Sequence, residues 1–75
     1  MNLSEAKPNQ KVIIEKINGT GLFQKRLLEM GLIPHTVVLV KKYAPFKDPI
    51  EIEIRHYILI LRKEEAQKIQ VRVIQ

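Results

Sequence analysis

The sequence predicts a mainly β fold, a small barrel of about five strands with one inserted α-helix. Short β-branched or alternating apolar segments recur along the chain, and turn residues separate them at close intervals. One stretch, residues 22–30, instead repeats its apolar side chains at helical spacing. The 75 residues are the size of one domain, so we expect a single unit over residues 1–75.

The strands are predicted from their β-branched residues and from alternation of apolar and polar side chains. Residues 50–55 alternate strictly, with isoleucine inward and charge outward, which is the clearest strand signal in the chain. Residues 62–68 are predicted to form a short helical turn before the last strand. The predicted strands are residues 12–17, 36–44, 50–55, 58–61 and 70–74.

The helix is predicted to pack one apolar face on the core. Thr20 precedes it as a candidate N-cap. Phe23, Leu27 and Met30 recur at helical spacing, and with Leu28 they complete the expected apolar face. The helix therefore lies against the sheet.

The helix is predicted to end at a glycine. Gly31 supplies the left-handed conformation of a C-cap without a Cβ penalty, and Leu32 can fold back onto Leu27. Pro34 cannot continue a helix and favours an extended Ile33. We therefore expect Gly31 and Pro34 to be structural residues.

Composition limits the chemistry of the chain. It contains no cysteine, which excludes disulfides and cysteine metal sites, and no apolar run approaches the roughly 20 residues of a membrane helix. The N-terminus lacks signal-peptide character, so we expect a soluble, cytoplasmic protein. The net charge of +5 is dispersed along the sequence, which favours a solvated surface over a nucleic-acid footprint.

Candidate catalytic groups have simpler interpretations. Ser4, the only serine, fits a capping role, and Asp48, the only aspartate, fits a turn. Glu51 and Glu53 share the solvent face of a predicted strand. No acid–base pair is indicated, so we expect a protein that is not an enzyme.

Candidate metal ligands are few. A set could be imagined from Glu29, Met30, His35 and His56, because imidazole and carboxylate suit iron or zinc. The histidines lack a ligand-type spacing, and a surface turn is the favoured interpretation of both. We expect no tight metal site.

Two exposed features are the expected partner-binding residues. On the helix they are Gln24, Lys25, Arg26 and Glu29. Gln24, Lys25 and Glu29 are expected to face water, and the orientation of Arg26 is ambiguous from the sequence. Phe46 stands at a turn tip, where an exposed aromatic fits a protein contact as well as it fits base stacking.

Three segments in register resemble a known family. They are LLEMGLIP at residues 27–34, APFKDPI at 44–50 and LRKEEA at 61–66, with LSE at 3–5, Pro8 and Gly19 in support. Together they closely resemble the FeoA family of bacterial ferrous iron transport, over nearly the whole chain. The resemblance implies an SH3-like β-barrel with one inserted helix.

The resemblance also implies a function. FeoA-like chains are cytoplasmic adaptors that bind the cytoplasmic part of FeoB, a membrane permease carrying a GTPase domain, and modulate transport. Family members are often described as transition-metal-binding by domain class, which makes Fe²⁺ or another divalent metal the implied ligand, although no motif here carries that chemistry. A metal-sensing or metal-delivering module, and a small nucleic-acid-binding barrel, are the alternatives. Weak self-association is left open.

The sequence departs from the family pattern at four positions where glycine is usual: Asn9, His35, Lys47 and His56. Neither histidine is therefore a position that the family would use as a metal ligand. Asn9, His35 and His56 fall at predicted turns, where glycine supplies a positive φ. We expect these three residues to adopt that conformation themselves.

Overall fold

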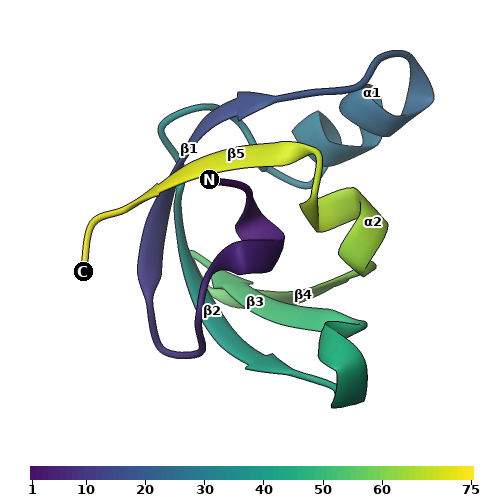
Figure 1. The fold of residues 1–75 in the computed structure, drawn as a ribbon. Helices are drawn as coiled ribbons and strands as arrows, with labels where there is room; N and C mark the ends of the chain where they lie inside the picture. The colour runs from purple at the N-terminus through teal and green to yellow at the C-terminus, as the bar shows by residue number, and fades with distance from the viewer.

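The computed structural model describes residues 1–75, except for the side chain of Lys47. Five antiparallel strands form one sheet in the order β4-β3-β2-β1-β5, and Figure 1 shows this sheet curling around the core. The strands are β1 (Lys11–Ile17), β2 (Val37–Tyr43), β3 (Ile50–Ile54), β4 (Tyr57–Leu61) and β5 (Ile69–Val73). Helix α1 (Leu22–Glu29) follows β1, helix α2 (Lys63–Ala66) precedes β5, and 3₁₀ turns occupy Leu3–Glu5 and Pro45–Lys47. The predicted mainly β class is confirmed, and element bounds differ from the prediction by one or two residues.

The core lies inside the curled sheet. The three isoleucines of β3 are fully buried, which confirms the alternation seen in the sequence. β1 pairs with both β2 and β5, and shifts in register interrupt β1 opposite β5 and β2 opposite β3. Such irregularities bend a strand and increase its twist, which helps a small sheet to curl. Leu3 and Ala6 from the N-terminal turn and Ala66 from α2 join the buried cluster.

The end of α1 has the predicted geometry. Gly31 has φ +87°, its N–H donates to the Leu28 carbonyl at 3.0 Å, and the Leu32 N–H donates to the Leu27 carbonyl at 2.9 Å. These two bonds define a Schellman motif. Leu27 and Leu32 are both fully buried, so the accompanying apolar contact lies in the core.

The start of α1 differs from the prediction. The N-cap is Gly21, with φ +64° and ψ −133°, and no side chain caps the helix. Thr20 is therefore not the N-cap. A backbone in this region is nearly exclusive to glycine, which explains why the helix begins after Gly21.

Positive φ occurs at two of the three predicted turn residues. Asn9 has φ +71° and His35 has φ +74°. The prediction for His56 is wrong, because the neighbouring Arg55 takes the positive φ of +53°. Arg55 and His56 form the two-residue turn between β3 and β4. A positive φ at the first central residue alone is typical of a type II′ hairpin turn.

Three side-chain contacts hold α1 to the rest of the molecule. Arg26 forms an ion pair with Glu65 in α2. The Lys68 ammonium lies 4.7 Å from the centre of the Phe23 ring, which is cation–π geometry. The Tyr57 hydroxyl donates to the main-chain carbonyl of Met30 at the end of the helix. Helix α1 therefore lies beside α2 and the start of β4.

Candidate functional site

Helix α1 presents the predicted polar residues together with apolar ones. Gln24, Lys25 and Glu29 are exposed, as expected. Leu22 is 85% exposed and Leu28 is 49% exposed, so Leu28 does not belong to the core-facing side. Leu28 lies one residue out of phase with Phe23, Leu27 and Met30, and this offset in the sequence indicates that Leu28 points away from the core. We call Leu22, Gln24, Lys25, Leu28 and Glu29 the α1 surface.

Arg26 has a structural partner. Its guanidinium pairs with the Glu65 carboxylate, whose side chain is only 18% exposed. A charge held against a neighbouring element serves first to position that element. Arg26 therefore differs from Lys25, which takes part in no ion pair among the described residues.

Phe46 lies on a separate surface. Its side chain is 94% exposed, in the 3₁₀ turn Pro45–Lys47 that follows β2. In Figure 1 this turn, coloured between teal and green, lies at the opposite end of the molecule from α1. The φ of Phe46 is +65°, which is uncommon for a bulky residue. The structure does not bring Phe46 and the α1 surface together.

The histidines are both exposed and lie in different turns. His35 lies in the turn between α1 and β2, and its main-chain N–H donates to the Ile14 carbonyl of β1 at 2.7 Å. His56 lies in the turn between β3 and β4. Within the described part of the chain, no three His, Cys, Asp or Glu side chains are grouped so as to hold a metal ion.

The catalytic candidates support turns and the sheet. Ser4 is buried and its hydroxyl donates to the Asn2 side chain. Asp48 accepts the main-chain N–H of Lys63 at 3.1 Å. Glu53 pairs with Lys41 at 3.7 Å on the outer face of the sheet. These groups lie on separate elements and do not converge.

The phenol of Tyr43 is the one described group with a clear change in acidity. Desolvation by burial raises the pKa of Tyr43, and its hydroxyl donates to the Ser4 carbonyl at 3.4 Å. The group ties the end of β2 to the N-terminal turn. Tyr43 is partly buried and packs against the core.

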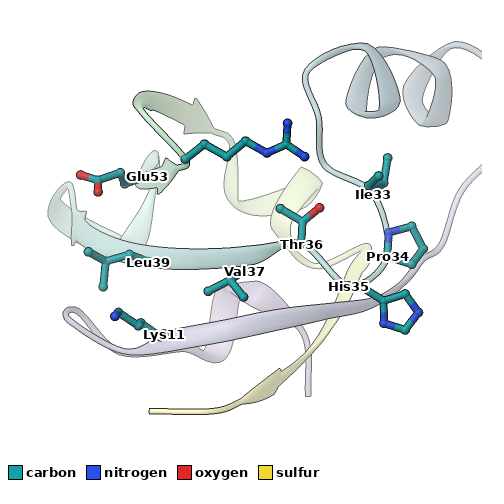
Figure 2. Close-up of a pocket in the computed structure, with 9 residues that line it drawn as sticks. Lys11, Ile33, Pro34, His35, Thr36, Val37, Leu39 and Glu53 are labelled. Atoms are coloured by element: carbon teal, nitrogen blue, oxygen red, sulfur yellow. The ribbon is translucent and has the colours of Figure 1, made fainter.

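A hollow of about 550 Å³ lies on the outer face of β1, β2 and β3. Val37 and Leu39 of β2 form its floor, and Figure 2 places Lys11 and Glu53 at one end and Pro34 and His35 at the other. The lining comes from three separated parts of the sequence. No pattern within any one of them predicted it.

The described chain contains no helix that is both long and apolar enough to cross a bilayer. A curled five-stranded antiparallel sheet with two short helices defines a small domain of the β-barrel class. The sequence profile of the FeoA domain matches residues 1–73. The chain therefore belongs to the FeoA family.

Two proteins named for iron transport are similar to the chain. It is 39% identical over 74 residues to an Fe(2+) transport protein A/Fe(2+) transporter FeoB fusion protein of Porphyromonas gingivalis, covering 99% of this chain and 9% of the fusion protein. A solution structure of iron(II) transport protein A from Clostridium thermocellum matches with a TM-score of 0.93 and 32% identity. That match covers 99% of this chain and 46% of the other.

A third comparison concerns the fold. The crystal structure of Stenotrophomonas maltophilia FeoA complexed with zinc, described as a procaryotic SH3 domain protein, matches with a TM-score of 0.84. The identity is 22%, over 96% of this chain and 89% of that one. The fold is therefore the SH3-like barrel that the resemblance implied.

Proposed function

We propose that this protein is a cytoplasmic accessory protein of ferrous iron uptake that binds the cytoplasmic part of a FeoB-type permease and modulates transport. It acts by contact and carries out no chemistry of its own. The GTPase domain that the family resemblance implies for such a permease is the proposed target.

The observation that carries this proposal is the fusion protein of Porphyromonas gingivalis, in which a segment similar to this whole chain is joined to FeoB. Fusing two proteins converts their encounter into an intramolecular event at high effective concentration. Such a fusion is useful when the two parts act on one another. A FeoA chain that is not joined to the permease would make the same contact by diffusion.

The α1 surface is the proposed principal contact. Leu22 and Leu28 offer exposed apolar area on either side of Lys25, and the helix gives all three a fixed geometry. Interfaces commonly combine a few apolar anchors with a polar rim. Phe46 is proposed as a second anchor, engaged only by a partner that reaches the opposite end of the barrel.

Calorimetric titration of the chain into the cytoplasmic domain of the ferrous permease from the same organism tests this proposal. The parent chain should bind. Lys25→Glu combined with Leu28→Glu should weaken binding by at least about tenfold, because it removes an apolar anchor and reverses a charge.

The matched control is Lys16→Glu combined with Val73→Glu, which makes the same changes at exposed positions on β1 and β5. It should bind like the parent. Equal binding by both double variants would exclude the α1 surface, and absence of binding by the parent would exclude the proposed partner. Circular dichroism establishes that each variant is folded.

A further inference from the structure

We propose that the hollow on the outer face of β1, β2 and β3 is a docking site for an extended acidic segment of a partner protein. An apolar side chain of that segment rests on Val37 and Leu39. Its flanking carboxylates reach Lys11 and Arg55, which line the same hollow.

The floor of the hollow is apolar and accessible. Val37 is 45% exposed, Leu39 is half-buried, and Ile33 beside them is 39% exposed. Figure 2 shows Val37 and Leu39 side by side along β2, with Ile33 and Pro34 at one end. Burying such a surface against an apolar side chain is favourable, because it removes apolar area from water.

The register of the sheet places cations on both sides of this floor. Lys11 on β1 lies opposite Leu39, and Leu39 lies opposite Glu53 on β3. Arg55 follows directly after the end of β3 and lines the same hollow as Val37. The floor on β2 is therefore flanked by Lys11 on one side and by Arg55 on the other.

These two cations are available to a ligand. Neither Lys11 nor Arg55 takes part in an ion pair within the described part of the chain. Glu53, the acidic residue of the hollow, is paired with Lys41 at 3.7 Å. The site therefore offers two unpaired positive charges about an apolar floor, which complements a segment with an apolar side chain between carboxylates.

Backbone strain also concentrates at this hollow. Four described residues other than glycine have positive φ, and two of them, His35 and Arg55, line it. Arg55 has φ +53° in the turn between β3 and β4, a conformation that glycine adopts without strain. Strained residues of this kind cluster at binding sites, where the side chain is needed in spite of its backbone.

The lining distinguishes a peptide from other occupants. The floor is aliphatic, so neither Val37 nor Leu39 offers a ring on which a base could stack, and the His35 ring lies only at one end of the hollow. A second copy of this chain, with a net charge of +5, offers poor charge complementarity. The proposal goes beyond the α1 contact and holds for any partner that carries such a segment.

An NMR titration of the ¹⁵N-labelled protein at low salt tests the proposal without the permease. The probe is a capped hexapeptide with two central leucines and two glutamates on each side. Amide shifts should be confined to residues that line the hollow. A peptide with glutamine in place of glutamate should bind about tenfold more weakly, as should one with serine in place of leucine.

Variants of Arg55 separate binding from stability. Arg55→Gly should leave the melting temperature unchanged or slightly raised, because glycine accepts the positive φ while it adds unfolded-state entropy, and yet it should weaken peptide binding. Arg55→Lys keeps the charge and should retain binding. The control Lys7→Gln combined with Lys16→Gln removes charge outside the hollow and should also retain binding. Lys11→Gln removes a charge of the hollow and should weaken binding.

Three results would overturn the proposal. The first is that Arg55→Gly and Lys11→Gln bind the peptide as tightly as the parent. The second is that amide shifts appear outside the hollow, or that none appear at millimolar peptide. The third is that a single-stranded oligothymidine binds at the hollow more tightly than the peptide does.

Discussion

At Gly31 a single residue decides where α1 stops and where the chain turns toward β2. Its φ of +87° permits both Schellman hydrogen bonds, and a Cβ at this position would lie 3.0 Å from the Tyr57 hydroxyl. That hydroxyl in turn donates to the Met30 carbonyl. Backbone conformation and a neighbouring side chain therefore both require glycine here.

Gly31→Val should lower the free energy of unfolding by well over about 1 kcal/mol, because a β-branched residue is poorly tolerated at positive φ. The denaturant midpoint, at an unchanged slope, measures this loss. In a Tyr57→Phe background, which relieves the crowding at the hydroxyl, part of the loss should be recovered. A midpoint equal to that of the parent would contradict the cap assignment.

The two histidines should respond differently to replacement by glycine. At His35, glycine removes a left-handed strain of roughly 1–2 kcal/mol and adds unfolded-state entropy worth up to about 1 kcal/mol, so His35→Gly should be neutral or slightly stabilising. At His56, where φ is not positive, only the entropic cost applies, and His56→Gly should cost up to about 1 kcal/mol.

Thermal melts of the two histidine variants, with and without Fe²⁺, make this comparison. If His35→Gly lowers the melting temperature by several degrees, particularly only in the presence of Fe²⁺, the His35 imidazole binds metal or makes a stabilising contact.

Among the elements, α1 is tied to the rest of the molecule by side-chain contacts as well as by the buried Leu27. The Arg26–Glu65 ion pair joins it to α2, and the Tyr57 hydroxyl anchors its last turn. Because the Arg26 side chain is 55% exposed, solvent screening limits the worth of this pair to about 0.2–1 kcal/mol. The pair positions the helix more than it stabilises the fold.

Arg26→Glu should therefore loosen α1 with little effect on global stability. Hydrogen exchange of the α1 amides should speed up, while exchange in β1 and β3 stays close to that of the parent. The exchanged pair, Arg26→Glu with Glu65→Arg, should restore most of the protection. Unchanged α1 exchange in Arg26→Glu would show that the ion pair does not hold the helix.

Some elements could be predicted from the sequence because their signal is local. The alternation of residues 50–55 gave β3, and the glycine and proline after residue 30 gave the end of α1. The Arg26–Glu65 pair and the hollow join residues far apart in sequence, so no local pattern contains them. In the turn between β3 and β4, the positive φ was predicted at His56 and is found at Arg55. Two-residue turns differ in which of the two residues adopts it, so the sequence could not decide between them.

At the scale of the whole molecule, the described residues offer surfaces for contact and no grouped set of metal ligands. We expect that the isolated protein retains no stoichiometric ferrous or zinc ion. Metal analysis after gel filtration of protein incubated with each ion checks this. Retained metal that is lost in a His35→Ala, His56→Ala double variant would contradict it.

We propose that this chain modulates ferrous iron uptake by acting on a FeoB-type permease. Radiolabelled Fe²⁺ uptake in cells that lack the chain and retain the permease tests this role. Uptake should be reduced in these cells; the parent chain should restore it, and the Lys25→Glu, Leu28→Glu variant, expressed at the same level, should not. Uptake that is the same with and without the chain would contradict it.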